Sequence, residues 1–142
     1  MTLRPTDSSA LLVDGKLVPG SAGVFDILNP ATEEVIGQAA DANAADMDSA
    51  IEAARRAFDT TSWSRDHAFR ARCLRQLRDA LQGHIEELRD ITIAEVGAPR
   101  FLTNGPQLEG PITDLDYFAD LAESYSWEQD LGLASPMGIK TH

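Results

Sequence analysis

The sequence predicts an α/β fold in which β-hairpins come first and about four helices follow. Two observations predict the hairpins: an Asp-Gly pair between short apolar runs in residues 11–18, and a strand–turn–strand pattern in residues 24–38. A third observation, apolar residues at helical spacing from Asn43 onward, predicts the helices. The length of 142 residues suits one domain with a buried core.

The two hairpins are predicted by their turns. Asp14-Gly15 favours a tight turn because glycine adopts a positive φ at little cost. At Asn29-Pro30 the next strand is broken, because the proline fixes its own φ, lacks an N–H and disfavours helix at the residue before it. Apolar residues fall on both faces of residues 24–28 and call for a cover that this chain provides only in part. We therefore expect this strand pair to be the edge of a larger sheet.

The first helix is predicted to begin after Asn43, whose side chain can cap it, with Asp46 at the third helical position. Small and bulky apolar residues recur along it at helical spacing, at Met47, Ala50, Ile51, Ala54, Ala57 and Phe58. This stripe predicts close packing on a sheet or on another helix.

A second helix is predicted to follow a cap at Ser64 or Asp66 and to run to about residue 82. Five arginines are spread around its faces, at Arg65, Arg70, Arg72, Arg75 and Arg78. Because they do not line one groove, we interpret them as partners of acidic helices and not as a nucleic-acid patch.

Two further helices complete the predicted set. The third runs to residue 95 or 96, where Gly97 stops it. Pro111 suits the first turn of the fourth helix, and Gly132 is expected to end that helix. Residues 137–140 are predicted to start a strand.

Composition excludes several classes of function. The net charge of −11 argues against nucleic acid and anionic membrane surfaces, because both are bound through clustered Lys and Arg. No apolar run approaches the roughly 20 residues that cross a bilayer. The single cysteine, Cys73, excludes an internal disulfide and fits a reducing compartment, so we expect a cytoplasmic protein.

Few side chains carry a chemical signal. Cys73 falls in the middle of the apolar stripe of its helix, which favours a core position over a nucleophile. His67 and His84 have no metal-ligand spacing to other residues, so solvated or capping roles are expected. Glu95 is placed at a helix C-terminus, where the dipole disfavours an anion, and this indicates either a nearby cation or an exposed end.

Six segments together resemble the N-terminal part of the NAD(P)-dependent aldehyde dehydrogenase superfamily, from about residue 11 onward. They are Val-Asp-Gly-Lys at 13–16, Asn-Pro-Ala-Thr-Glu-Glu-Val-Ile at 29–36, the run 46–58 with Trp63 after it, Arg-Ala-Arg-Cys-Leu-Arg at 70–75, Glu-Val-Gly-Ala-Pro at 95–99 and Asp-Tyr-Phe-Ala-Asp at 116–120. Their order and spacing make the resemblance specific. It implies a flexible N-terminus at residues 1–10 and a partial cofactor-domain segment at 11–142 that is truncated at its C-terminal end.

The resemblance implies a function for the full-length enzyme. Such an enzyme has a Rossmann-like cofactor domain, oxidises an aldehyde to a carboxylic acid with NAD or NADP, and assembles into a homo-oligomer. Its catalytic cysteine, glutamate and asparagine are not among these 142 residues, and Cys73 matches a position that is not catalytic. We therefore expect the chain alone to be inactive, to bind no cofactor, and to have the rest of the subunit as its partner.

The resemblance also implies two lesser sites. A monovalent cation would be held by the backbone of Ile27 or Leu28 and by Glu95. A helix over residues 106–113 would line the substrate entrance, with the small residues Pro106 and Gly110 leaving a roomy mouth. The alternative interpretation is a free-standing helical interaction module that uses its apolar helix faces to bind a dehydrogenase subunit.

Overall fold

The computed structural model describes residues 10–134 and 139–140, and its first element is the predicted Asp-Gly hairpin. Strand β1 (Ala10–Val13) pairs antiparallel with β2 (Lys16–Pro19). Asp14 and Gly15 have φ values of 53° and 71°, the left-handed pair that a tight two-residue hairpin turn requires. This hairpin prediction is confirmed. Of the N-terminal stretch 1–10, expected to be flexible, only Ala10 lies within the described residues, and it begins β1.

The second hairpin joins β3 (Gly23–Leu28) to β4 (Val35–Asp41), also antiparallel. The side-chain oxygen of Asn29 accepts the N–H of Ala31 at 2.8 Å, and the backbone of Asn29 is hydrogen-bonded to Glu33 and Glu34. The predicted strand–turn–strand is confirmed. Large apolar side chains of the hairpin are about half exposed, at Val24, Phe25, Leu28 and Val35. Within the described residues this hairpin forms a sheet of its own, which agrees with its interpretation as an uncovered edge.

Helix α1 (Ala44–Thr60) has the predicted N-terminus but not the predicted packing. Asn43 caps it, and the carboxylate of Asp46 accepts the N–H of Asn43 at 3.0 Å, which completes the capping box. The apolar stripe, however, contains no buried residue, and Met47 and Ile51 are each more than half exposed. The helix was correctly predicted because its signals are local, whereas the described elements leave its apolar stripe uncovered, so the expected packing partner is not among them.

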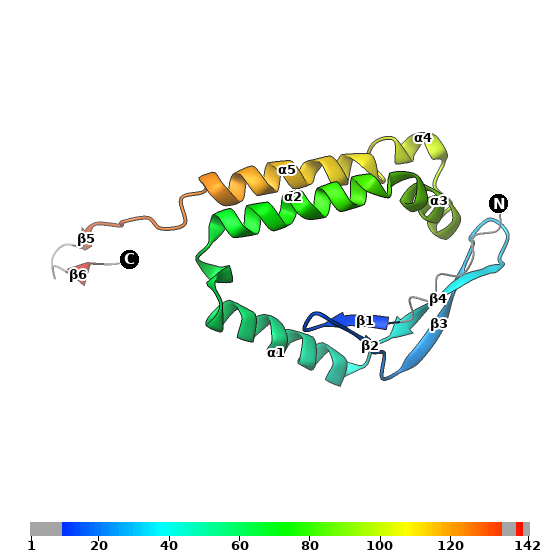
Figure 1. Ribbon diagram of the computed structural model, residues 1–142, viewed down its shortest axis with the longest axis horizontal. Helices are drawn as coiled ribbons and strands as arrows, with labels where there is room; N and C mark the ends of the chain where they lie inside the picture. The colour runs from blue at the N-terminus through cyan, green and yellow to red at the C-terminus, as the bar shows by residue number, and fades with distance from the viewer. Residues whose placement is uncertain (1–9, 135–138, 141–142) are drawn as a thin grey trace.

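Helices α2 (His67–Gly83) and α5 (Glu109–Ser124) lie side by side along most of their lengths (Figure 1). A short 3₁₀ turn, η1 (Ser62–Ser64), leads into α2, and Asp66 caps it as predicted by accepting the N–H of Phe69. Ala71 of α2 and Ala119 of α5 are completely buried. Small residues at these points let the two helix backbones approach each other closely.

The arginines of α2 pair with the acidic face of α5. Arg75 lies 2.7 Å from Asp120 and 2.8 Å from Glu123, and Arg78 contacts Asp116 at 2.5 Å. The prediction that arginines of this helix are partners of acidic helices is confirmed for these two. The Arg75 guanidinium holds the pKa of Glu123 below its usual range.

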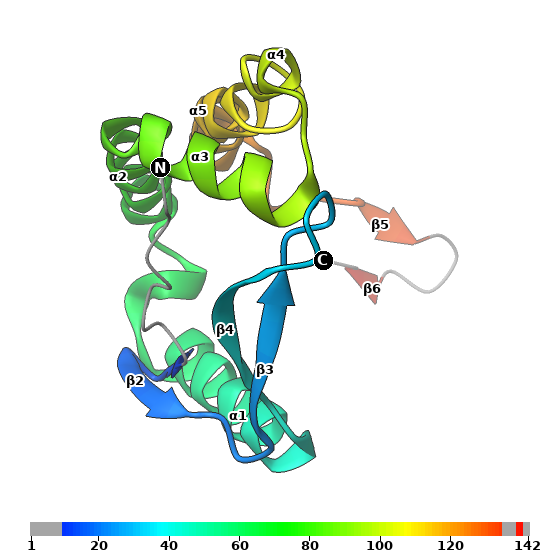
Figure 2. The same cartoon turned by 90° about the vertical axis from the view of Figure 1, so that its right-hand side faces the viewer.

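Helix α3 (Ile85–Val96) ends at Gly97, which has a φ of 67° and caps the helix in the left-handed conformation, as predicted. The one-turn helix α4 (Arg100–Thr103) follows. Helix α5 then starts at Glu109, so Pro111 lies in its first turn, also as predicted. Figures 1 and 2 show α2 to α5 gathered on one side of the molecule and the two hairpins with α1 on the other.

The end of α5 was predicted wrongly. The helix stops at Ser124 and Tyr125 is already extended, whereas Gly132, with a φ of 76°, precedes the short strand β5 (Leu133–Ala134). A tertiary contact accounts for the early end: the ring of Trp127 stacks on His67 of α2 with centroids 4.8 Å apart. Strand β6 (Ile139–Lys140) pairs with β5 and confirms part of the predicted strand, but residues 137 and 138 lie outside the described residues.

No helix in the part of the chain that the structure describes is long and apolar enough to cross a membrane.

Candidate functional site

The two segments predicted to hold a monovalent cation meet through their neighbours Pro30 and Gly97. Ile27 and Leu28 lie at the end of β3, where the register with β4 shifts, and Glu95 is in the last turn of α3. The turn after β3 meets the end of α3 so closely that a Cβ on Gly97 would lie 3.1 Å from Cγ of Pro30. The Glu95 side chain is exposed. Among the described residues no three His, Cys, Asp or Glu side chains form a metal-binding group, so these segments offer one carboxylate and backbone carbonyls.

The predicted entrance residues flank a compact turn, residues 104–109, between α4 and α5. Pro106 is exposed within this turn, and Gly110 is the second residue of α5. The expected helix over 106–113 is therefore wrong at its start, because α5 begins only at Glu109, after the turn has closed. Gly110 has a local reason to be small: its N–H donates to the carbonyl of Gly105 at 2.8 Å, and a Cβ there would lie 3.1 Å from that oxygen.

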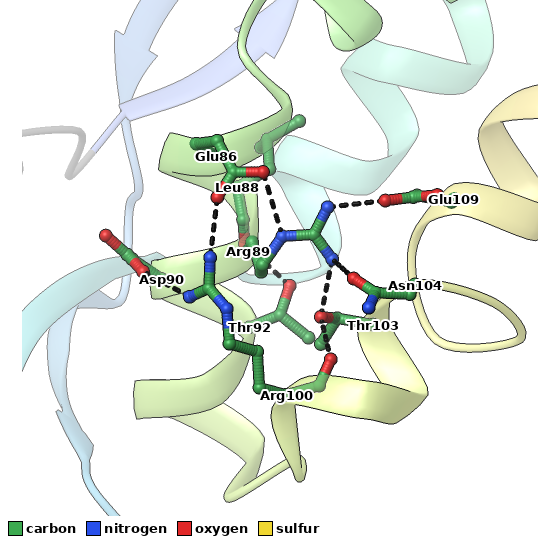
Figure 3. A network of polar contacts seen from close by, with 9 residues as sticks. All are labelled: Glu86, Leu88, Arg89, Asp90, Thr92, Arg100, Thr103, Asn104 and Glu109. Atoms are coloured by element: carbon green, nitrogen blue, oxygen red, sulfur yellow. Dashed lines mark hydrogen bonds and ion pairs between the residues drawn. The ribbon is translucent and has the colours of Figure 1, made fainter.

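Beside this turn lies a polar network centred on Arg89, whose side chain is only 4% exposed (Figure 3). Its Nη1 donates to Thr103 at 2.7 Å and to Asn104 at 2.6 Å. Its Nε donates to Glu86, and its Nη2 donates to Glu109. The network thus joins α3, α4 and the start of α5 through one side chain.

Hydrogen bonds and charge stabilise the ionised forms of Arg89 and Glu86. The Glu109 carboxylate raises the pKa of Arg89, and Arg89 in turn lowers the pKa of Glu86. Glu86 also pairs with the exposed Arg100 at 2.7 Å. Because four of the five guanidinium N–H groups have protein acceptors, Arg89 is arranged to hold structure and not to bind a ligand.

The sequence analysis missed Arg89, although a signal was present. It lies four residues after Ile85 and next to Leu88, and therefore on the face of α3 that the periodicity marks as apolar. A charged residue on that face is a buried cation that needs partners.

The helix N-termini do not fit the pyrophosphate of a dinucleotide. Helix α1 follows a strand, as a phosphate-binding helix does, but Asn43 already accepts its first free N–H groups. Hydrogen bonds from Ser21 and the Asn43 backbone lower the pKa of Asp46, so a carboxylate occupies the site where a phosphate would lie. Acidic residues also stand at the other long helix starts, at Asp66, Glu86, Glu87 and Glu109. These acidic side chains offset the positive end of each helix dipole, which disfavours a phosphate there.

An open hollow lies where α2 begins. It is lined by Ser62, Arg65, Asp66, His67, Ala68 and Glu123. Nδ1 of His67 faces Arg70, and the Arg70 guanidinium lies 4.5 Å from the Trp127 ring centre. His67 is thus a packing residue and not the solvated or capping residue that was expected. His84 is exposed at the N-cap position of α3, as expected, and its Nδ1 lies 3.1 Å from the Glu87 carboxylate. Cys73 is half-buried in the middle of α2 and does not line the hollow.

Comparison with known proteins gives a consistent result. Residues 17–139 match the model of the aldehyde dehydrogenase family. Geranial dehydrogenase of Castellaniella defragrans is 33% identical over 139 residues, which are 95% of this chain and 28% of that protein. A mitochondrial aldehyde dehydrogenase of Arabidopsis thaliana, family 2 member B4, is 37% identical over 91 residues, or 63% of this chain and 17% of that protein.

Solved structures show the same likeness in three dimensions. The aldehyde dehydrogenase of Mycobacterium tuberculosis complexed with NAD+ superposes with a TM-score of 0.77 and 30% identity, over 86% of this chain and 26% of that one. The chain spans about a quarter of the length of the relatives and solved structures it matches. Its hairpins and helices are the N-terminal part of that α/β fold. The chain therefore belongs to the aldehyde dehydrogenase family, of whose members it represents the N-terminal part.

Proposed function

We propose that this chain serves as the N-terminal segment of an NAD(P)-dependent aldehyde dehydrogenase and performs no chemistry alone. The observation that carries the proposal is the mismatch of coverage: 95% of this chain corresponds to only 28% of geranial dehydrogenase. The reaction we propose for the whole enzyme is oxidation of an aldehyde to a carboxylic acid, with NAD or NADP accepting the hydride. Its nucleophile would lie outside these residues, because Cys73 is half-buried in the middle of α2 and a reactive thiolate needs exposure.

In this proposal, residues 11–142 form an incomplete part of the cofactor domain. The exposed apolar side chains of β3 and α1, such as Phe25 and Ile51, would be covered by the rest of the subunit, and complete subunits would form a homo-oligomer. The single cysteine supports a cytoplasmic location, where thiols stay reduced.

We also propose the two lesser sites for the whole enzyme. The turn with Pro106 and the start of α5 with Gly110 would border the substrate entrance, supported by the exposure of that turn. A monovalent cation would bind the carbonyls of Ile27 or Leu28 and the Glu95 side chain, supported by the close approach of those segments. Melting the complete gene product in sodium, potassium and choline chloride tests the cation site. A higher melting temperature with one cation only, which Glu95→Gln abolishes, supports the site. Equal melting temperatures in all three salts contradict it.

One observation favours a second candidate, an interaction module. The apolar residues exposed on α1 form a continuous stripe, which a free-standing protein would use to bind a partner. Cooperative melting of a monodisperse chain, followed by circular dichroism and size-exclusion chromatography, would support the module. Aggregation or dye binding typical of a molten state would support the segment.

The activity test compares two samples. The purified 142-residue chain is mixed with an aldehyde and NAD+ or NADP+, and absorbance at 340 nm is followed. The complete gene product, isolated from its own cells with an antibody against this chain and sized by mass spectrometry, is assayed in parallel. The proposal expects activity only in a product several times larger than this chain. Turnover by the chain alone, or an inactive gene product, contradicts it.

A further inference from the structure

The turn 104–109 is held at both ends by the same side chain. Asn104 opens the turn and its Oδ1 accepts from Nη1 of Arg89 at 2.6 Å, whereas Glu109 closes the turn and accepts from Nη2 (Figure 3). The two acceptors are five residues apart in the sequence and meet on one guanidinium. Arg89 comes from α3 and is not part of the turn.

The rest of the turn is held by its own backbone. The carbonyl of Leu102 accepts from both Gly105 and Gln107 at 3.2 Å, and Leu108 donates to Gly105 at 3.3 Å. Gly110 donates to the carbonyl of Gly105 at 2.8 Å, so the turn also has one short backbone bond. The side chains of Pro106 and Gln107 are exposed and add no packing. Arg89 adds what these backbone bonds lack, a contact from outside the turn that joins Asn104 to Glu109.

Arg89 is itself anchored away from the turn. Its side chain is 4% exposed, Nη1 bonds the buried Thr103, and Nε bonds Glu86. The Thr103 hydroxyl in turn donates to the carbonyl of Arg100 at 2.6 Å, which links Arg89 to the backbone of α4. The guanidinium is thus a fixed point on the α3–α4 corner, and the two turn ends attach to it.

Loss of the guanidinium would free both ends of the turn together. Within the described residues Glu109 pairs with no other cation. Its carboxylate could turn to water at the start of α5, where the helix dipole still stabilises it. Asn104 would lose its charged donor, a stronger bond than one between neutral groups. The closed form of the turn would then compete poorly with open ones.

We propose that Arg89 is a positioning residue that fixes the turn 104–109 and, with it, the shape of the substrate entrance at Pro106 and Gly110. Its effect on the entrance rests on the function proposed above, whereas its hold on the turn does not. Arg89 touches no reacting atom. It acts through Asn104 and Glu109.

Hydrogen exchange of the complete gene product, read at the amides of the turn, tests whether Arg89 holds the turn. In Arg89→Met, exchange of the Gly105, Gln107, Leu108 and Gly110 amides should rise at least about tenfold, because a buried charge-assisted contact is lost at each end. Arg89→Lys keeps the charge but loses the separate N–H donors of the guanidinium, and should give a smaller rise in the exchange rates. Arg100→Met is the matched control: it removes the same charge beside Glu86, does not contact the turn, and should leave these amides unchanged.

Each result tests whether Arg89 keeps the turn 104–109 closed. Faster exchange confined to the turn, with α2 unchanged, supports the proposal, and unchanged turn amides in a folded Arg89→Met chain overturn it. If that variant does not fold, Asn104→Ala and Glu109→Ala replace it, since each removes one end of the clamp. Either should speed exchange at its own end of the turn, and no change in both overturns the proposal.

Kinetics of the complete gene product test the effect on the entrance. Arg89→Lys should raise KM for a bulky aldehyde several-fold while kcat and KM for the cofactor stay within about twofold, because positioning at the mouth affects substrate entry and not the chemical step. Equal losses in all three constants would mean a general structural role and overturn the entrance claim. If the gene product oxidises no aldehyde, the proposed function fails, and hydrogen exchange still decides the hold on the turn.

Discussion

Pro30 in the β3–β4 turn lies directly against Gly97 at the end of α3, so that a Cβ on the glycine would stand 3.1 Å from Cγ of the proline ring. This contact joins the hairpin side of the molecule to the helical side. It depends on a glycine for two separate reasons, the close approach and the left-handed φ of 67°.

Gly97→Ala should therefore destabilise the chain by about 1–2 kcal/mol, since alanine is strained at this φ and its methyl group meets the proline ring. Urea unfolding followed by circular dichroism measures the change. Gly83→Ala is the control: it lies at the end of α2 with open space around it, and it should be neutral or slightly stabilising. Equal effects of the two substitutions would contradict the role of the contact.

Asp46 should make the stability of the chain depend on pH in the acidic range. Hydrogen bonds from Ser21 and the backbone of Asn43 lower its pKa in the folded chain, so its contribution is present above the ordinary carboxylate range and is lost as the pH falls through the folded value. Asp46→Asn should lower the melting temperature by a few degrees at neutral pH. The difference from the unchanged chain should shrink below about pH 4.

Asp48→Asn is the control for Asp46→Asn, because it removes the same charge two residues further along, at an exposed position of α1. It should leave both the melting temperature and its acid dependence nearly unchanged. A constant difference between Asp46→Asn and the unchanged chain across the acid range would refute the linkage.

Arg75 should control the ionisation of Glu123. The guanidinium donates to that carboxylate at 2.8 Å and lowers its pKa, so Arg75→Gln should move the pKa of Glu123 up toward the ordinary range. Carbon-13 NMR titration of the glutamate carboxyl groups measures this shift. Arg55→Gln, which breaks an exposed pair within α1, should leave Glu123 unaffected. An unchanged pKa of Glu123 in the Arg75→Gln variant would rule out this coupling.

Ala71→Leu should disturb the contact between α2 and α5. Ala71 is fully buried, and a leucine there overpacks the interface at a cost of about 1–3 kcal/mol. Ala80→Leu places the same side chain on an exposed position of the same helix and should change stability by less than about 0.5 kcal/mol. Chemical denaturation of both variants checks the difference, and similar midpoints would show that the interface has room.

The features that the sequence predicted correctly are those whose causes lie within a few residues. Asn43 and Asp46 satisfy each other across one helical turn, Asp14-Gly15 forms its turn without outside help, and Gly97 ends α3 by its own backbone preference. These signals need no knowledge of the tertiary structure. They gave the hairpins and most of the helix boundaries.

The features that could not be predicted depend on partners far away in the chain. Trp127 stacks on His67, 60 positions earlier, and α5 ends at Ser124 and not at Gly132. The α1 stripe has helical periodicity, but periodicity does not say whether a covering element is present. Arg89 was missed because its four partners, in α3, α4, the turn after α4 and α5, become neighbours only when the corner between these helices has formed.

The pairing of α2 with α5 also sets an order of events during synthesis. Arg75 is separated from Asp120 by 45 residues, so α2 leaves the ribosome well before its partner exists. At translation rates of about 5–20 residues per second, that delay is roughly 2–9 s. The hairpins and α1 need only local contacts and can form within microseconds of emerging. For several seconds, then, the α2 face that bears Ala71 is open to chaperones, and only the arrival of α5 closes it.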